Sequence, residues 1–255
     1  MSSICIRHNT GDYRMTTIAI IGNNLVGLFC AGILSDNNEV LIINSELELG
    51  FPASFPGSSN DINFLKNFLS DQQIDQLFIK DSLDSSNFRS EWFSKLVTHK
   101  LAKKGVLIAN RTRISDINNV DGNLILSTTG GYLNVENFEC KTILDFSEYS
   151  YNPLASKTHQ YKLTDRNIIK PKIDTKQFFV GICLESEAHN LSKYQLKLPR
   201  NDGLVETWYD KDNLESPTKG WIESKTVKAY FESKIMLVED YFIKAQEICK
   251  NMVIQ

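Results

Sequence analysis

The sequence lacks several features that would assign it to a function class at once. None of its apolar runs approaches the roughly 20 residues needed to cross a bilayer, and a formal charge of −3 provides no basic surface for nucleic acid. The first residues do not combine a basic segment with a long apolar stretch, so a secretory signal is not expected. We therefore expect a cytoplasmic protein with no membrane span and no nucleic-acid partner.

Cysteine pairs and familiar catalytic motifs are also missing. The five cysteines are widely separated and form no Cys-x-x-Cys pair, so neither a disulfide framework nor a zinc site is indicated. The sequence contains neither the Gly-x-Ser-x-Gly elbow of the α/β-hydrolases nor the His-Glu-x-x-His motif of zinc proteases. Hydrolase and metalloprotease functions therefore have no support, and no metal is expected.

The chain does contain a strand, a tight turn, a helix and a second strand near its start. Residues 17–21 and 40–43 are continuous apolar runs with β-branched residues, as buried parallel strands require. Apolar residues recur at helical spacing from 25 to 34 between them. A strand–helix–strand unit of about 30 residues is a right-handed crossover. The pattern therefore predicts an α/β fold with a Rossmann-like parallel sheet.

The turn after the first strand resembles a dinucleotide-binding turn. Such a turn holds a diphosphate against the N–H groups of a helix N-terminus, and Gly22 and Gly27 match its first and third glycines. Asn24 replaces the second glycine; asparagine tolerates positive φ, but its side chain occupies the phosphate position. Where an acid usually holds the ribose, the second strand ends at Asn44, with Glu46 two residues later on the same side.

The remainder of the first part alternates helix and strand up to about residue 150. Helical spacing marks residues 61–79 and 90–104, and Gly105 follows the second segment in the usual position for a helix end. Asp121-Gly122 predicts a hairpin turn within a β-meander. The strands expected in this region lie at 106–109, 113–117, 123–128, 132–135 and 142–145.

From about residue 151 the pattern predicts a second, smaller lobe rich in strands. The later periodicity, over residues 226–252, is that of one or two amphipathic helices. Met15 stands directly before the first strand and is an alternative starting residue. The predicted division is a flexible extension at 1–15, a Rossmann-like domain at 16–150, a β-rich substrate lobe at 151–225, and a C-terminal helix at 226–255 that packs back on the first domain.

Several passages together resemble the FAD-dependent oxidoreductases with the two-dinucleotide fold, in particular their geranylgeranyl reductase, lycopene cyclase and aromatic hydroxylase branch. Residues 87–96 resemble the branch's helix that begins with an arginine, here Arg89. Residues 104–114 resemble its Gly-Val, strand and Thr-x-Val passage. Residues 124–135 resemble its β-meander, and 142–145 the strand that returns to the nucleotide.

The resemblance implies an FAD-dependent oxidoreductase that acts on an unidentified small molecule between the two lobes. It places Arg89 near a cofactor phosphate, Ile114 beside the adenine and Asp145 in polar contact with the nucleotide. An exposed arginine at a helix start and a helix-capping role for Asp145 remain the alternatives. Residues 50–57, rich in proline and glycine, form either a loop over the flavin or a structural loop.

The chain departs from the branch at three points, and it is also short. Asn24 and Asn44 replace a glycine and an acid, and Phe146 follows the returning strand where the branch has glycine. The branch's late Gly-Asp has no counterpart, since the only Gly-Asp is Gly11-Asp12. These departures leave two alternatives open: a non-catalytic Rossmann-like subunit or pseudoenzyme that acts through a protein partner, in a homo- or hetero-oligomer, and an NAD(P)-binding enzyme without flavin.

Overall fold

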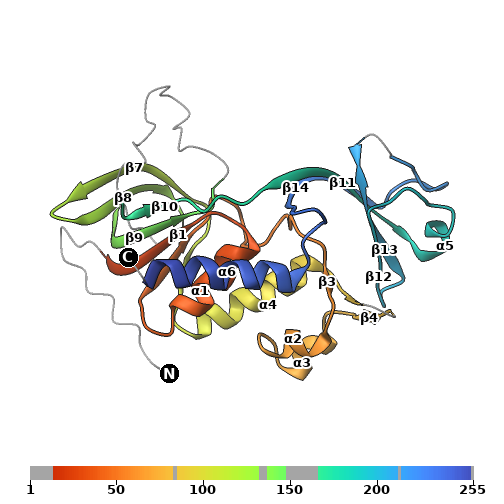
Figure 1. Ribbon diagram of the computed structural model, residues 1–255, viewed down its shortest axis with the longest axis horizontal. Helices are drawn as coiled ribbons and strands as arrows, with labels where there is room; N and C mark the ends of the chain where they lie inside the picture. Colours follow the sequence, from red (N-terminus) through yellow and green to blue (C-terminus); the bar gives the residue numbers. More distant parts are fainter. Residues whose placement is uncertain (1–13, 83–84, 132–136, 148–165, 212–213, 254–255) are drawn as a thin grey trace.

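Three sheets and three long helices make up the computed structural model, which describes residues 14–82, 85–131, 137–147, 166–211 and 214–253 (Figure 1). The flexible extension expected at 1–15 lies outside the described residues, except that Arg14 and Met15 already belong to the first strand. The strand expected at 132–135 also lies outside them. The strand–helix–strand unit is confirmed as β1 (Arg14–Ile21), α1 (Leu25–Leu34) and β2 (Val40–Ile43).

The largest sheet, sheet A, has seven strands in the order β6-β2-β1-β9-β8-β7, with β10 beside β9. Strands β6, β2, β1, β9 and β10 run parallel to one another, and β7 and β8 continue the sheet beyond β9 as an antiparallel meander. The additional strands are β6 (Leu107–Ala109), β7 (Thr112–Val120), β8 (Asn123–Gly130), β9 (Asn137–Asp145) and β10 (Ile168–Ile169).

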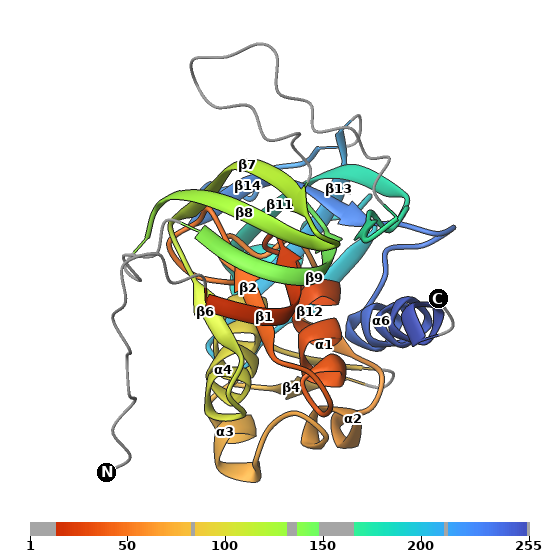
Figure 2. The ribbon, with the colours of Figure 1, turned by 90° about the vertical axis from the view of Figure 1, so that its left-hand side faces the viewer.

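Strands β1 and β2 are buried on both faces, which explains why they are continuous apolar runs. Ile18 and Ile20 pack against the helices, whereas Ala19 and Ile21 pack against residues of the meander. Figure 2 shows these two layers, with β7 and β8 over one face of the parallel strands and α1 and α4 (Ser90–Lys103) on the other. The parallel strands therefore form the middle of a three-layer core.

The helical layer contains helices from both the early and the late part of the sequence. Helix α6 (Val238–Val253) packs against α1, and α4 lies on the same side of the sheet. Helix α4 ends directly before Gly105, whose φ of +98° confirms the expected helix end. The segment expected to be helical at 61–79 forms two short helices, α2 (Ile62–Lys66) and α3 (Asp71–Asp75), each with a side-chain N-cap.

Sheet C is antiparallel and forms the second lobe, with strand order β12-β13-β11-β14. Its strands are β11 (Thr175–Leu184), β12 (Leu196–Pro199), β13 (Leu204–Asp210) and β14 (Glu223–Tyr230), and α5 (Glu185–Ala188) follows β11. A small third sheet, sheet B, contains β3 (Ser58–Ser59), β4 (Lys80–Asp81) and β5 (Ser86–Asn87).

The helix predicted from residue 226 is wrong for its first part. Residues 226–230 belong to β14, in which Val227 and Ala229 are buried and Lys228 between them is exposed. This alternation has the period of two that a strand requires. The strand pairs with β11 along its whole length, so sheet C extends further along the chain than expected, and the C-terminal helix begins only at Val238.

Two general properties of the described residues concern partners. None of their helices combines the length and apolar character of a membrane-spanning segment. No group of three or more His, Cys, Asp or Glu side chains comes together among them in a way that could hold a metal ion.

Candidate functional site

A cavity of about 480 Å³ lies at the carboxyl ends of the parallel strands of sheet A. This edge is where open α/β sheets bind their ligands, and the volume is within the range of small-molecule sites. The cavity, called the cleft below, also reaches sheet C and the loop at residues 50–57. It is lined by Gly22, Asn23, Asn24, Asn44, Ser45, Glu46, Pro52, Ser54, Asp145, Phe146, Ser147, Lys170, Pro171, Ile173, Thr175, Lys228, Tyr230 and Tyr241.

The turn between β1 and α1 forms one wall of the cleft. Gly22 has a φ of +117°, which L side chains rarely adopt, and a Cβ there would lie 2.9 Å from the backbone carbon of Phe146. The Gly22 N–H donates to the carbonyl of Ile43, and the Phe146 N–H donates to the carbonyl of Ile21. A glycine is therefore required at position 22, because the ends of three strands meet there.

Asn24 closes the N-terminus of α1 with its own side chain. Its Oδ1 accepts a hydrogen bond of 2.7 Å from the Gly27 N–H, and its Nδ2 donates to the Phe146 carbonyl at 3.5 Å. The Asn24 backbone is extended, with a φ of −137°. Tolerance of positive φ is therefore not the reason for asparagine here; capping the helix is. The N–H group that a bound anion would use has an internal acceptor.

The end of β2 separates the two candidate ribose contacts. Asn44 is buried, its Oδ1 accepts from the Glu46 N–H at 3.0 Å, and its Nδ2 donates to Oδ1 of Asn110 at 3.2 Å. Glu46 is exposed and lines the cleft. Asn44 therefore shapes the strand end, whereas Glu46 presents a carboxylate to the cleft.

The returning strand β9 brings Asp145 to the same edge. Asp145 is buried; its Oδ1 accepts hydrogen bonds from the N–H (2.8 Å) and the hydroxyl (2.5 Å) of Ser147, and its Oδ2 lies 3.5 Å from the Lys170 ammonium. The Phe146 ring lies beside Gly27, since a Cβ on Gly27 would approach Phe146 Cδ2 to 3.3 Å. Asp145 thus caps a turn and pairs with a lysine at the wall of the cleft.

Five of the eight candidate cofactor contacts line the cleft: Gly22, Asn24, Asn44, Glu46 and Asp145. Gly27 lies directly behind Asn24. Arg89 and Ile114 lie elsewhere. Arg89 pairs with glutamates near sheet C, and Ile114 is buried in the core between the parallel strands and the meander.

Sequence reasoning did not single out Lys170, Tyr230 or Tyr241, which also line the cleft. Lys170 follows a strand of only two residues, which is too short for a periodic signal. Tyr230 ends β14, the segment taken for helix. Tyr230 and Tyr241 stack with ring centroids 5.2 Å apart, and burial raises the pKa of the Tyr241 hydroxyl. The alternation in residues 223–230 was the signal that could have located Tyr230.

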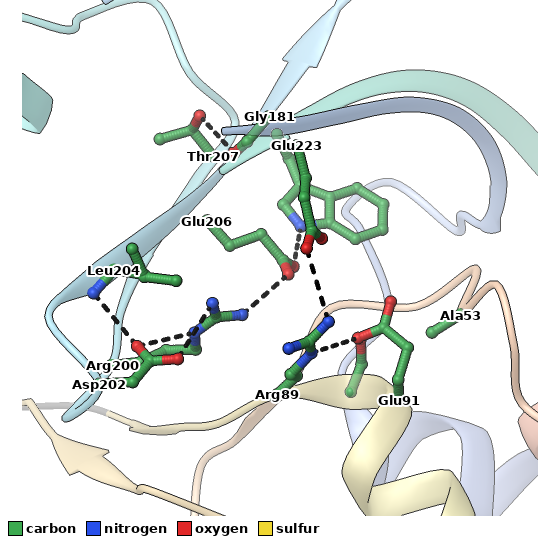
Figure 3. A network of polar contacts seen from close by, with 12 residues as sticks. Ala53, Arg89, Glu91, Gly181, Arg200, Asp202, Leu204, Glu206, Thr207 and Glu223 are labelled. Carbon is green, nitrogen blue, oxygen red and sulfur yellow. Dashed lines mark hydrogen bonds and ion pairs between the residues drawn. The ribbon is translucent and has the colours of Figure 1, made fainter. Parts of the chain in front are cut away.

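A second polar cluster joins sheet C to the N-terminus of α4 and is called the sheet C interface below (Figure 3). It comprises Arg89, Glu91, Arg200, Asp202, Glu206, Glu223 and Lys225. The Lys225 ammonium donates to Oε1 of Glu91 at 2.8 Å and to the carbonyl of Ala53 at 2.9 Å. Burial alone would raise the pKa of the Glu91 carboxyl, but the Lys225 ammonium and, less strongly, Arg89 outweigh it and hold this pKa below its ordinary value.

The other half of the sheet C interface is more deeply buried. Glu206 accepts a hydrogen bond of 2.7 Å from the Trp208 indole and lies 3.8 Å from the Arg200 guanidinium. Burial raises the pKa of the Glu206 carboxyl, although Trp208, Lys225 and Arg200 oppose the shift. Both terminal nitrogens of Arg200 are buried and donate no hydrogen bond to any described residue, although Nη2 lies 3.3 Å from Oδ2 of Asp202. Arg200 and Glu206 are buried charges within the β12–β13 hairpin, and neither of them lines the cleft.

Comparison with known proteins shows similarity in structure only. No protein-family model matches the sequence, and no curated protein matches it. Among solved structures, a geranylgeranyl bacteriochlorophyll reductase-like protein from Thermoplasma acidophilum matches with a TM-score of 0.62 at 10% identity, over 94% of this chain and 78% of that one. The p-nitrophenol 4-monooxygenase PnpA from Pseudomonas putida matches with a TM-score of 0.58 at 11% identity, over 95% and 80%.

Two further matches are enzymes with other activities, an oxidase and a halogenase. The glycine oxidase from Geobacillus kaustophilus has a TM-score of 0.55 at 9% identity, over 93% of this chain and 94% of that one. The halogenase PltM, in a complex with phloroglucinol and FAD, has a TM-score of 0.56 at 10% identity, over 93% and 69%. These matches confirm the predicted fold class and the resemblance, in fold, to the FAD-dependent oxidoreductases.

Proposed function

We propose that the protein is a small FAD-dependent oxidoreductase that binds its flavin nucleotide in the cleft and a small-molecule substrate between sheet A and sheet C. The observation that carries the proposal is the course of the cleft. It runs from the β1–α1 turn and Glu46 to Thr175, Lys228 and Tyr230 of sheet C. PltM, whose fold this chain shares, has been crystallised with FAD.

The residues of the cleft fit a flavin nucleotide along most of its length. The N-terminus of α1 would face the diphosphate, because the helix dipole favours negative charge there. Glu46 would accept hydrogen bonds from the ribose hydroxyls. Bound flavin would supply the redox chemistry, and the chain would supply its position and surroundings. The stacked Tyr230 and Tyr241 would exclude water from the end of the cleft near sheet C.

The Asn24 side chain is the one obstacle, and magnitudes decide whether it prevents binding. A side-chain N-cap is worth about 1 kcal/mol, whereas a hydrogen bond to a charged group contributes about 1.5–3 kcal/mol. A diphosphate that replaces the Asn24 amide at the Gly27 N–H therefore gains more than the lost cap costs. The nucleotide fits if Asn24 rotates away from the helix end.

Titration of the purified protein with FAD tests the proposal. We expect saturable binding with one FAD per chain, followed through the quenching of flavin fluorescence and the shift of its visible absorbance. Reduction of the bound flavin by dithionite and its reoxidation in air would then show redox competence. A folded protein that binds no FAD at saturating concentration would contradict the proposal.

A second candidate function follows from the internal hydrogen bonds of Asn24 and Asn44. A cleft whose polar groups already have partners is also what a non-catalytic subunit would have after losing its flavin. We propose this pseudoenzyme, which would act through a protein partner, as the alternative. Absence of FAD binding, together with a stable partner complex isolated from the source cells, would favour it.

A further inference from the structure

The polar groups that would contact a nucleotide already have partners within the chain. At the diphosphate position, Oδ1 of Asn24 accepts the hydrogen bond of the Gly27 N–H. At the end of β2, both ends of the Asn44 amide bond to neighbouring residues, including Glu46. The hydrogen bonds of Asn24 and Asn44 are therefore satisfied without a ligand.

The acidic side chains in the first turn of α6 also have partners within the chain. Oε1 of Glu239, in its first turn, accepts hydrogen bonds from the Ser59 hydroxyl at 2.5 Å and from the N–H groups of Asn60 at 2.7 Å and Asp61 at 3.2 Å. The Leu237 N–H donates to Asp240 at 2.8 Å. The N-terminus of α1 and the acidic side chains in the first turn of α6 therefore both have hydrogen-bond partners within the chain.

From these contacts we infer that FAD is an exchangeable ligand of this protein and not a permanently bound group, and that Asn24 sets its affinity. The inference rests on the proposed function. The net contribution of a hydrogen bond depends on the bond that it replaces. At Gly27 the ligand exchanges an internal hydrogen bond for its own, so it gains only the difference between them. The empty protein meanwhile keeps its helix cap and loses little stability when FAD leaves.

Asn24 therefore acts as a competitor that occupies the position of an anion. Removing its side chain should weaken the empty protein and strengthen FAD binding, because only the empty state uses the cap. An ordinary structural residue would change these two properties in the same direction, or would change stability alone. The opposite signs identify the role.

The experiment compares Asn24→Ala, Asn24→Asp and the unmodified protein in FAD titrations and in thermal unfolding without FAD. We expect Asn24→Ala to bind FAD about fivefold more tightly, since a lost cap of typical strength corresponds to that factor, and to unfold at a lower temperature. Asn24→Asp keeps the cap and adds a negative charge, so it should bind FAD at least about tenfold more weakly. The unmodified protein should lose FAD on repeated desalting.

Ser70→Ala is the matched control. Ser70 caps α3 through the Gln73 N–H and does not line the cleft, so this variant should lose stability without a change in FAD affinity. If Asn24→Ala does not fold, Asn24→Gly replaces it, because glycine is accepted at N-caps.

Two results overturn the inference. If the unmodified protein binds FAD and Asn24→Ala binds it equally or less tightly, Asn24 is not a competitor, while the proposed function stands. If neither protein binds FAD although both are folded, the proposed function fails, and the inference fails with it.

Discussion

The cleft and the sheet C interface differ in how their polar side chains are paired. At the cleft, Asn24 and Asn44 are neutral and make internal hydrogen bonds, and Asp145 forms an ion pair with Lys170 at its wall. In the sheet C interface the polar groups are charged; Arg200 and Glu206 are deeply buried, and the terminal nitrogens of Arg200 donate no hydrogen bond to any described residue. The cleft can exchange its partners for those of a ligand. The interface cannot, because a buried charge without its partner is strongly unfavourable.

The two kinds of contact differ in the free energy that is needed to break them. Neutral hydrogen bonds contribute about 1 kcal/mol each, so a ligand can displace them. Breaking a buried ion pair costs about 3–5 kcal/mol, which is a large part of the stability of a typical domain. The Arg200–Glu206 pair therefore fixes the β12–β13 hairpin, and the Lys225–Glu91 pair fixes sheet C against α4, whereas a ligand can replace the hydrogen bonds of the cleft.

The largest effect is expected when the sheet C interface is broken. Arg200→Ala leaves the Glu206 carboxyl buried without its cation, and should lower the free energy of unfolding by about 3–5 kcal/mol, measured by urea denaturation. The double variant Arg200→Met/Glu206→Leu removes both charges and should recover much of this loss. A loss below 1 kcal/mol in Arg200→Ala would show that the interface does not depend on the ion pair.

A bulky residue behind Asn24 should act on the cleft instead. The Cβ of Gly27→Leu would already lie 3.3 Å from Phe146 and 3.4 Å from Asn24, so the longer side chain must displace both residues. We expect FAD binding to be lost and stability to fall by about 1–3 kcal/mol through overpacking. Gly32→Ala on the same helix is the control, because its Cβ makes only an ordinary contact with Leu101. Unchanged FAD affinity in a folded Gly27→Leu would contradict the assigned site.

The pH dependence of stability sharpens the contrast within the sheet C interface. The pKa of Glu91 is lowered in the folded protein, so its ion pair with Lys225 stabilises the fold above the ordinary pKa of 4.5 and loses this effect as the pH falls through the lowered value. Glu91→Gln should therefore be less stable at neutral pH, by about 1–2 kcal/mol. The difference should shrink as unfolding is measured at pH values below 4.5.

The contribution of Glu206 to stability should change with pH in the opposite direction to that of Glu91. Burial raises its pKa, so its contribution is greatest below the ordinary value and is lost as the pH rises through the raised value. In Glu91→Gln the remaining pH dependence of this cluster should follow Glu206. If the stability difference between Glu91→Gln and the unmodified protein does not change with pH, the pH dependence does not come from the Glu91 ion pair.

The smallest effect is expected at the ribose position. Glu46→Ala removes an exposed carboxylate from the cleft wall and should weaken FAD binding by about fivefold, the value of one hydrogen bond. Glu48→Ala is the control, since Glu48 is also exposed but pairs with Lys95 outside the cleft. Equal affinities of the two variants would show that Glu46 does not contact the nucleotide.

Local pattern was sufficient for much of the fold. The apolar runs of β1 and β2, the helical spacing of α1 and the glycine after α4 predicted these elements, because each depends on neighbouring residues. Strand β14 was missed because its alternation rests on only two apolar positions, Val227 and Ala229, which is too short a signal to exclude a helix.

The candidate site was predictable where it follows from strand ends. Gly22, Asn44 and Asp145 meet because parallel strands end at one edge of a sheet. The role of Asn24 as a cap needed the backbone, since the same residue at positive φ would not reach the Gly27 N–H. The pairing of Arg89 with Glu223 depends on a contact between α4 and sheet C that no local pattern encodes. The pairing of Arg200 with Glu206 lies within the β12–β13 hairpin and depends on its strand register.

Lys225 links sheet C to the loop at residues 50–57. Its ammonium, carried on a strand of sheet C, bonds to the carbonyl of Ala53, which stands between Pro52 and Ser54 at the rim of the cleft. A displacement of sheet C would therefore move this peptide group, and with it the residues on either side that line the cleft.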